Sequence, residues 1–142
     1  LGLEKLFPTS PIFAQYHQGW KSLNTIHEID SPVGAFYLVS KSAIDKAGLL
    51  DEQFFMYAED LDWSLRIKQQ GFKIMYVPTT KIIHHKKKAG RESTNQTLRS
   101  TTSGHFFITM KLFYNKHYRH KYPFIVRWLT LAGIWVISKL RS

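Results

Sequence analysis

Acidic side chains gather within and just before an aromatic-rich stretch, residues 54–85, which ends in a pair of histidines. The side chains that could do chemistry are Asp51, Glu59, Asp60, Asp62, His84 and His85. Carboxylates and imidazoles are groups that proteins use to move protons and to bind divalent cations. Negative charge is favourable at a helix N-terminus, so a solvated helix start explains some of these acids. It does not explain why acids, aromatics and histidines occur in this order.

The chain before the acids is expected to form a strand, a short helix and a loop. Residues 34–40, GAFYLVS, are apolar and rich in aromatic and branched side chains, which favours a buried strand. Residues 41–48 favour one or two helical turns that end at Gly48. Residues 49–57 are expected to form a loop that crosses back over the sheet.

The acids open the clearest helix in the sequence, residues 58–71. Leu61 and Leu65 are expected on its apolar stripe. Asp62 lies four residues before Arg66, which is the favourable order for an ion pair on a helix, so Asp62 is expected to have a structural role.

Further along the chain, residues 72–78 and 80–85 have the pattern of two strands, and residues 98–118 favour a basic, aromatic helix. A polar, basic loop is expected between the second strand and this helix.

Composition and charge narrow the class of protein. With 44% hydrophobic and 15% aromatic residues, the chain is not a disordered tail, and its lack of cysteine excludes disulfides and thiolate metal sites. Residues 1–80 hold seven Lys/Arg and nine Asp/Glu, whereas residues 81–142 hold thirteen Lys/Arg and one acid. This asymmetry indicates an anionic partner, such as a phosphorylated substrate, a membrane surface or nucleic acid.

The order of these features over residues 30–92 resembles the C-terminal half of family-two inverting glycosyltransferases, in particular rhamnosyltransferase-like members that build bacterial polysaccharides. The positions that carry the resemblance are Gly34, Ala35, Phe36, Gly48, Asp51, Glu52, Phe54, Phe55, Tyr57, Glu59, Asp60, Asp62, Arg66, Gly71, Phe72, Tyr76, Pro78 and His84. The resemblance implies an α/β fold class: a partial GT-A (Rossmann-like) fold, its acceptor-side half with a mixed sheet in residues 1–92. Basic amphipathic helices would follow in residues 93–142.

The resemblance also implies roles for individual residues in an inverting sugar transfer. Asp60 would be the base that takes the proton of the acceptor hydroxyl. The acceptor would be bound by Glu59, Gly34, Ala35 and Trp63. His84 would join a divalent metal ion, Mg²⁺ or Mn²⁺, while Lys86 and Arg91 would approach the leaving diphosphate.

Several of these assignments have a plainer alternative, and Glu59 could be a helix-capping group. Asp60 could serve only the helix N-terminus, and His84 could be an ordinary strand histidine. Lys86–Lys88 could form a solvated loop. Trp63 and the pair Phe54–Phe55 could belong to the core instead of stacking on an acceptor. Gly34 could serve strand packing alone.

The C-terminal tail combines aromatic and cationic side chains, as do protein segments at a bilayer interface. Its members are Phe106, Phe107, Lys111, Phe113, Tyr114, Lys116, His117, Tyr118, Arg119, Lys121, Tyr122, Arg127, Trp128 and Trp135. We therefore expect a cytoplasmic protein that is peripheral on the anionic inner face of the plasma membrane. A full span is not favoured, because the apolar run after Arg127 is too short.

Three functions follow from these patterns. The resemblance implies transfer from a nucleotide-sugar donor to a lipid-linked saccharide acceptor. No Asp-x-Asp motif stands at the end of a strand, since Asp60-Leu61-Asp62 lies at a helix start, so the donor-binding half of the family is absent. No initiator Met is present either, and a fragment inactive alone is expected. A nucleic-acid-binding module is the rival, although no nucleic-acid-binding signature is found and no nucleic acid is expected. A non-catalytic assembly piece that forms a homo-oligomer is the third.

Overall fold

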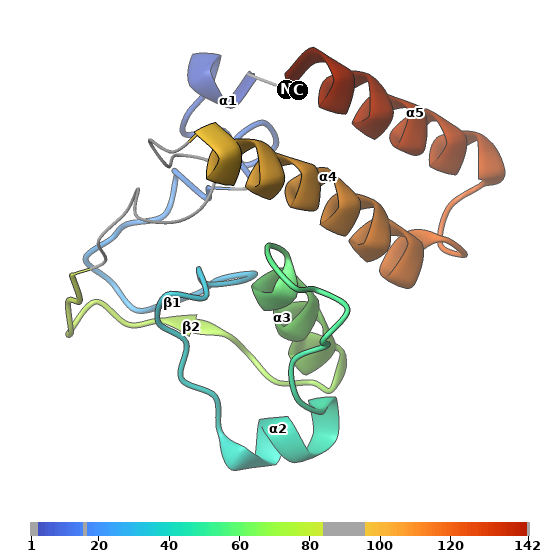
Figure 1. Cartoon of the computed structure of the whole chain (residues 1–142). Coiled ribbons are helices and arrows are strands. Elements are labelled where there is room, and N and C mark those ends of the chain that lie inside the picture. The colour runs from blue at the N-terminus through green and yellow to red at the C-terminus, as the bar shows by residue number, and fades with distance from the viewer. Residues whose placement is uncertain (1–2, 16, 84–95, 142) are drawn as a thin grey trace.

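A computed structural model describes residues 3–15, 17–83 and 96–141, and the side chains of residues 104–140 in the C-terminal part. Within this part the molecule is mostly helical, with five helices and one very small sheet. The helices are α1 (Leu3–Leu6), α2 (Lys41–Ala47), α3 (Glu59–Gln69), α4 (Gln96–Tyr118) and α5 (Phe124–Arg141), and the strands are β1 (His27–Glu28) and β2 (Met75–Tyr76). Helices α2 and α3 and the sheet form one layer, and the hairpin of α4 and α5 forms another (Figure 1).

The short helix α2 has clear signals at both ends. Ser40 is its N-cap residue, and the Ser40 hydroxyl accepts a hydrogen bond from the Ala43 N–H at 3.3 Å. The Gly48 N–H donates to the Ile44 carbonyl at 2.8 Å, and Gly48 has a φ of 77°, a value that favours glycine. The predicted helix over residues 41–48 is confirmed.

Helix α3 begins one residue later than predicted, and the chain leaves it through Gly71, whose φ is 82°. Its buried residues are Asp62, Ser64 and Ile67, whereas Leu61 and Leu65 are only half-buried. The predicted apolar stripe is therefore not the most buried face, because two polar side chains on α3 are covered by other parts of the chain.

The sheet is much smaller than the mixed sheet expected from the sequence. Strands β1 and β2 pair antiparallel, with His27 opposite Tyr76 and Glu28 opposite Met75. Residues 34–40 contain a turn, with the Phe36 N–H donating to the Val33 carbonyl at 3.3 Å, followed by chain without a pairing strand. No Rossmann-like sheet is present among the described residues.

The physical reason is the lack of neighbouring strands. A buried strand needs neighbouring strands for its backbone N–H and C=O groups, and in the described chain only residues 75–76 of the predicted strand 72–78 pair with another strand, with the Ile74 carbonyl accepting from Ile29 beside them. Residues 80–83 form no strand, and the rest of the predicted strand 80–85 lies outside the described residues.

A small apolar core joins α2, α3 and the β2 segment. Ala43, Ile67 and Ile74 are buried together. The half-buried apolar side chains packed against them are Ile29, Tyr37, Val39, Ala47, Trp63 and Phe72. This core fixes α3 relative to α2, so the acids of the first turn of α3 have a defined position.

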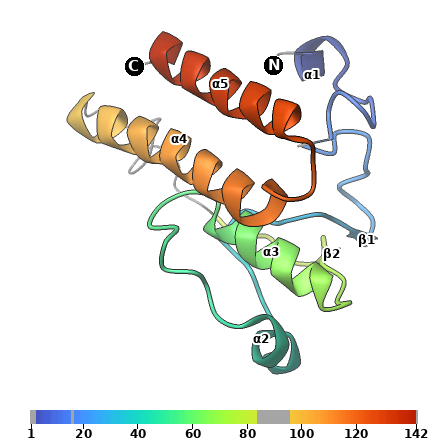
Figure 2. The same cartoon turned by 90° about the vertical axis from the view of Figure 1, so that its right-hand side faces the viewer.

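The predicted C-terminal helices are present. Helix α4 covers the predicted range 98–118, and α5 runs antiparallel beside it (Figures 1 and 2). Pro123 directly precedes α5, where its missing N–H costs no helical hydrogen bond, and its carbonyl accepts from Val126 at 3.0 Å. None of the described helices combines the length and the apolar character needed to cross a bilayer.

Candidate active site

Asp60, the predicted base, lies in the first turn of α3 with its carboxylate held by backbone amides. Its Oδ2 accepts from the Gly34 N–H at 2.9 Å, and its Oδ1 accepts from the Leu61 N–H at 2.8 Å. A carboxylate offers about four lone-pair positions, so both oxygens keep room for a further donor. Asp60 is half-buried. Its side chain is therefore oriented but still able to accept a hydrogen bond from a ligand.

Glu59 and Gly34 lie beside this carboxylate. A Cβ on Gly34 would lie 3.7 Å from both Cβ and Oδ2 of Asp60 and 3.9 Å from Oε1 of Glu59. Oε2 of Glu59 is buried and has no hydrogen-bond partner among the described residues. A buried polar atom without a partner costs free energy, which indicates a missing donor. The sequence predicted that these three residues share a site, and they do lie together; Ala35 follows on the exposed side of the turn.

Trp63 is committed to packing. Its indole N–H donates to the Gly48 carbonyl at 2.8 Å, and its ring lies edge-on to Tyr37 with centroids 5.5 Å apart. It also packs against the core of Ala43, Ile67 and Ile74. These contacts favour the core alternative for Trp63, and its role in acceptor binding stays a prediction.

The Phe54–Phe55 pair divides between core and surface. Phe54 is buried, whereas Phe55 is 78% exposed. The core alternative therefore fits only the first of the two.

Asp62 is fully buried and lies at the centre of a charged cluster. Its Oδ2 accepts from Arg66 Nε at 2.8 Å, which confirms the predicted pair. Its Oδ1 accepts from Lys116 Nζ and from His117 Nε2, both at 2.7 Å, and both residues belong to α4. Lys116 also reaches Oδ2 of Asp51 at 2.6 Å. We call Asp51, Asp62, Lys116 and His117 the acid–base clasp, because it fastens α4 to α3 and the loop before it. Helix α4 lies next to the start of α3 (Figure 2).

The clasp keeps its carboxylates ionised. Burial by itself would raise the pKa of Asp62, but the hydrogen bonds from Lys116, His117 and Arg66 outweigh it and lower that pKa. The hydrogen bond from Lys116 also lowers the pKa of Asp51. Both acids therefore bind α4 as anions at neutral pH.

Arg66 joins α3 to the end of α2. Besides Asp62, its guanidinium donates to the Ala47 carbonyl and, at 2.8 Å, to the Leu49 carbonyl. A planar guanidinium can serve several acceptors at once, which a lysine ammonium at the same place cannot do in this geometry. Arg66 thus fixes the segment that leads from α2 into the loop before the acids.

A hydroxyl chain lies behind the candidate base. Ser64, 1% exposed, donates to the Ser31 hydroxyl at 2.8 Å and contacts the Tyr37 hydroxyl at 3.2 Å. Ser31 in turn donates to the Asp60 backbone carbonyl at 3.3 Å. Burial raises the pKa of Tyr37, opposed by the hydrogen bond with Ser64 and assisted by the negative charge of Asp60. These hydrogen-bonded hydroxyls tie the backbone of Asp60 to residues 31–37, the segment that contains Gly34.

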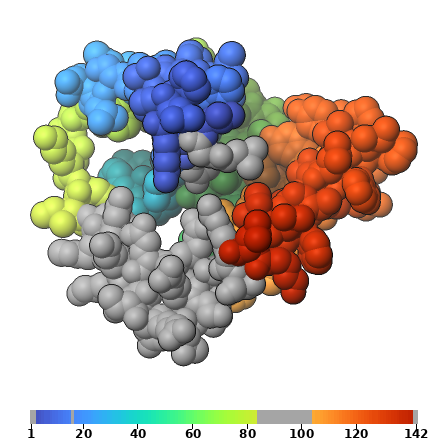
Figure 3. Space-filling model, turned by 90° about the horizontal axis from the view of Figure 1, so that it is seen from above, coloured from blue at the N-terminus to red at the C-terminus, as the bar shows by residue number. Residues whose placement is uncertain are grey.

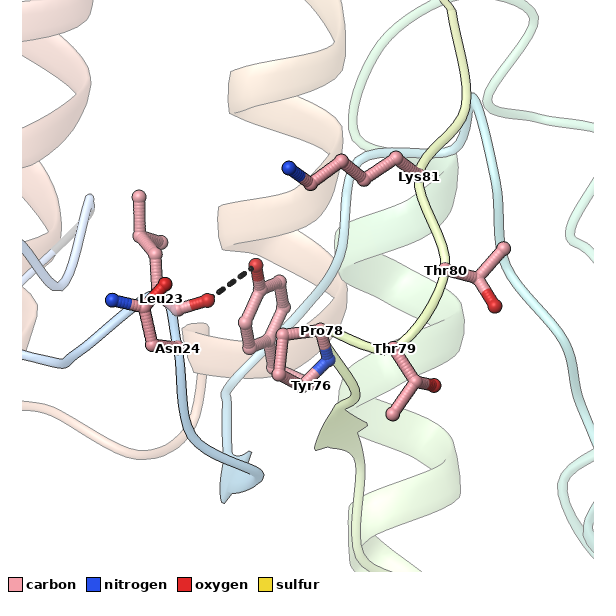
Figure 4. Close-up of a pocket in the computed structure, with 7 residues that line it drawn as sticks. All are labelled: Leu23, Asn24, Tyr76, Pro78, Thr79, Thr80 and Lys81. Atoms are coloured by element: carbon pink, nitrogen blue, oxygen red, sulfur yellow. Dashed lines mark hydrogen bonds between the residues drawn. The ribbon is translucent and has the colours of Figure 1, made fainter.

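A shallow pocket of about 360 Å³ lies at another place, beside the sheet (Figure 4). Its lining residues are Leu23, Asn24, Tyr76, Pro78, Thr79, Thr80 and Lys81. The Tyr76 hydroxyl donates across it to the Leu23 carbonyl at 3.2 Å. Asp60 does not line this pocket, so the chemistry indicated by the sequence and this cavity do not coincide.

Several predicted site residues cannot be placed. His84, His85, Lys86 and Arg91 lie outside the described residues. Within the described part, no group of three or more histidine, aspartate and glutamate side chains is placed to hold a metal ion. The described residues alone therefore do not fit a complete Mg²⁺ or Mn²⁺ site.

Lys116 and His117 are the contacts that sequence reasoning missed. Both were assigned to the membrane-facing tail on composition alone, whereas their side chains turn toward α3. His117 lies 55 residues from Asp62, so no local pattern could have paired them. The one signal in the sequence was Asp62 itself, because its pairing with Arg66 leaves one carboxylate oxygen free for a second donor.

Comparison with known proteins places the chain among distant homologues of rhamnosyltransferases, which confirms the resemblance seen in the sequence. It is 30% identical over 111 residues to N-acetylglucosaminyl-diphospho-decaprenol L-rhamnosyltransferase of Mycobacterium tuberculosis, in strains CDC 1551 / Oshkosh and ATCC 25618 / H37Rv. That match covers 75% of this chain and 34% of the relative. Rhamnosyltransferase WbbL of Escherichia coli K12 is 37% identical over 57 residues, which is 40% of this chain and 22% of the relative.

The chain thus corresponds to about a third of the length of the curated relatives that it matches. No protein-family model matches it. No solved structure matches it significantly.

Proposed function

We propose that the chain is the acceptor-side part of a rhamnosyltransferase-like inverting glycosyltransferase. The reaction would move a sugar from a nucleotide-sugar donor to a lipid-linked saccharide during cell-surface polysaccharide synthesis. The lipid-linked acceptor is suggested by the name of the mycobacterial relative, which contains N-acetylglucosaminyl-diphospho-decaprenol. The chain alone is proposed to be inactive, and a GT-A sheet would form only together with a donor-binding half.

The observation that carries the proposal is the orientation of Asp60. Backbone N–H groups of Gly34 and Leu61 hold its carboxylate at the N-terminus of α3, and each carboxylate oxygen can accept a further hydrogen bond. The acceptor hydroxyl would donate to this carboxylate. As its oxygen bonds to the anomeric carbon, its proton passes to Asp60. The bond from that carbon to the diphosphate oxygen breaks, and the nucleoside diphosphate leaves with the electron pair.

Glu59 would position the same acceptor. Its Oε1 lies beside Gly34 and Asp60, where a carboxylate would accept from a second sugar hydroxyl. Gly34 would allow close approach, since the space at its Cα is bounded by Asp60 and Glu59.

The test is Asp60→Asn in a protein that carries this chain together with a donor-binding half. Transfer should fall by about 100- to 10,000-fold, the usual contribution of a general base, with nucleotide binding retained. Asp45→Asn is the matched control, because Asp45 is an exposed acid on α2 that pairs with Lys41. Normal turnover by the Asn variant would remove Asp60 from the reaction.

A divalent cation at the diphosphate is proposed from the resemblance alone, with His84 as one ligand and with Lys86 and Arg91 near the diphosphate. The role assigned to Asp60 does not depend on this cation. Chelation of divalent metal should reduce transfer, and His84→Ala should weaken the response to added Mn²⁺. An unchanged metal response in that variant would exclude His84.

A contact with an anionic membrane surface is proposed for α5, which lies at the surface of the molecule (Figure 3). Seven apolar side chains along one side of α5 are between 46% and 80% exposed: Phe124, Ile125, Leu129, Trp128, Trp135, Val136 and Leu140. On the opposite side Ile134 is buried, whereas its described neighbours there are mostly half-buried. The exposed apolar side of α5 is therefore incompletely covered by its own chain.

The occupant we propose for this exposed side is a bilayer interface. Tryptophans beside basic residues favour the headgroup region, and residues 81–142 hold thirteen Lys/Arg and one acid. Binding to vesicles that contain phosphatidylglycerol should be lost in Trp128→Ser/Trp135→Ser but kept in Leu38→Ser, whose side chain is 82% exposed elsewhere.

Two outcomes would favour other functions. Salt-sensitive binding to mixed-sequence DNA, with none to anionic vesicles, would indicate the nucleic-acid-binding module. Concentration-dependent dimerisation that is abolished by the same double serine variant would indicate a homo-oligomer interface instead.

A further inference from the structure

The turn that leads into α3 has an unusual backbone. Tyr57 and Ala58 have φ values of 68° and 62°, so two consecutive residues other than glycine lie in the left-handed region. Such conformations are uncommon and persist where surrounding contacts determine them. Ala58 is also the N-cap residue of α3, and it provides no side-chain hydrogen bond to the helix. The first turn of α3 therefore needs support from other parts of the chain.

Helix α4 supplies this support on both sides of Asp60. Before Asp60 in the sequence, the ring of Tyr57 lies edge-on to Phe106, with centroids 5.7 Å apart. After it, Asp62 accepts from Lys116 Nζ and His117 Nε2, both at 2.7 Å. The backbone of the same turn is closed by the Asp62 N–H, which donates to the Ala58 carbonyl at 2.9 Å.

The charges in this contact are matched. The acids that face α4 are Asp51 and Asp62, and both are met by Lys116, while His117 serves Asp62 alone. The His117 side chain is 7% exposed and that of Asp62 is 0% exposed. Since Asp62 is an anion, Nε2 of His117 carries the hydrogen that it donates. The pair of Asp62 and His117 is thus a buried contact with a directional hydrogen bond, whereas the Lys116 side chain is 29% exposed.

We propose that Lys116 and His117 are positioning residues for the Asp60 base. By holding Asp62, they fix the first turn of α3 and so set the direction of the Asp60 carboxylate two residues earlier. The C-terminal hairpin that we propose to rest on a membrane would then be mechanically coupled to the base. This inference rests on the proposed function, because a positioning role requires a base to position.

The activity test uses a protein that carries this chain and a donor-binding half, with His117→Leu and Lys116→Met as variants. Each should lower kcat by about 10- to 100-fold while KM for the acceptor changes by less than about two-fold, because a displacement of about 1 Å impairs the reacting geometry more than binding. His117→Gln keeps an N–H donor and should restore most of kcat.

Matched controls separate this effect from loss of charge or imidazole in general. Lys41→Met removes a cation from an exposed ion pair with Asp45 on α2, and His120→Leu removes an exposed imidazole just after α4. Both should leave kcat unchanged. In an Asp60→Asn background, His117→Leu should cause no further loss, since no base remains to be positioned. Wild-type kcat in folded His117→Leu and Lys116→Met would overturn the inference.

A second measurement tests the clasp without activity. In the 142-residue chain, the backbone amides of Leu61 and Asp62 should exchange with deuterium at least about 10-fold faster in His117→Leu than in His120→Leu, because the first turn of α3 opens more often. Equal exchange rates would overturn the inference. Normal transfer by Asp60→Asn would instead contradict the proposed base, whatever the exchange shows, so the two failures are distinguishable.

Discussion

The substitution Asp62→Asn probes the contact between α3 and α4 most directly. The native carboxylate accepts from Arg66 Nε at 2.8 Å on one oxygen and from Lys116 and His117 at 2.7 Å on the other. Asparagine has almost the same shape, but one of its two terminal atoms is an NH₂ donor. In either orientation of the amide, this donor faces another donor, and the positive charges of Arg66 and Lys116 lose their buried counterion.

The expected loss of unfolding free energy depends on which hydrogen-bond partners Lys116 and Arg66 keep in the variant. Removing one partner of a buried ion pair costs about 3–5 kcal/mol. Lys116 keeps Asp51 at 2.6 Å, and Arg66 keeps the carbonyls of Ala47 and Leu49, so the lower end applies. We expect the free energy of unfolding to fall by about 3 kcal/mol. For a chain of this size that corresponds to a decrease in Tm of about 10 °C.

The assay is urea unfolding followed by tryptophan fluorescence and by far-UV circular dichroism, with Asp45→Asn as control. Asp45 pairs with Lys41 in an exposed i,i+4 ion pair, and its loss should cost less than about 0.5 kcal/mol. If Asp62→Asn cost no more than Asp45→Asn, the carboxylate would not be buried in the clasp, and the reasoning on the docking of α4 would be refuted.

Three further predictions concern glycines and acid. Gly34→Ala should change the free energy of unfolding by less than about 0.5 kcal/mol, because the added Cβ would make ordinary contacts at 3.7 Å. Gly34→Pro removes the N–H that donates to Asp60 and should lower the free energy of unfolding by about 1–3 kcal/mol; urea unfolding measures both variants. Gly48→Ala should cost about 1–2 kcal/mol in the same assay because its φ is 77°; an Ala variant as stable as wild type would contradict the left-handed assignment. The lowered pKa values of Asp51 and Asp62 predict that their stabilisation is complete above the ordinary pKa of 3.8 and is lost as the pH falls through the lowered values. Unfolding free energies between pH 7 and pH 2 should show this acid decline, and a decline of equal size in Asp62→Asn would contradict it.

Local signals predicted the helices well. Gly48 and Gly71 mark the ends of α2 and α3, and the i,i+4 spacing predicted the pair of Asp62 and Arg66. Each of these features depends on residues within one or two helical turns, which a sequence pattern can show.

The strands and the environment of Asp62 depend on distant residues and were predicted poorly. Residues 34–40 have strand composition but find no strand partner among the described residues, since composition cannot supply a neighbour. The basic tail was interpreted by composition as facing a membrane. Lys116 and His117 nevertheless turn toward α3, where both bind the buried carboxylate of Asp62.

The separation of 55 residues between Asp62 and His117 has a consequence for biosynthesis. At elongation rates of about 5–20 residues per second, the ribosome needs roughly 3–11 s after Asp62 to add His117. During that interval the nascent α3 carries a carboxylate whose burial is not yet compensated from α4. Final docking of α3 must therefore wait until α4 has left the exit tunnel, so the time needed to synthesise α4 sets the earliest time at which this contact can form.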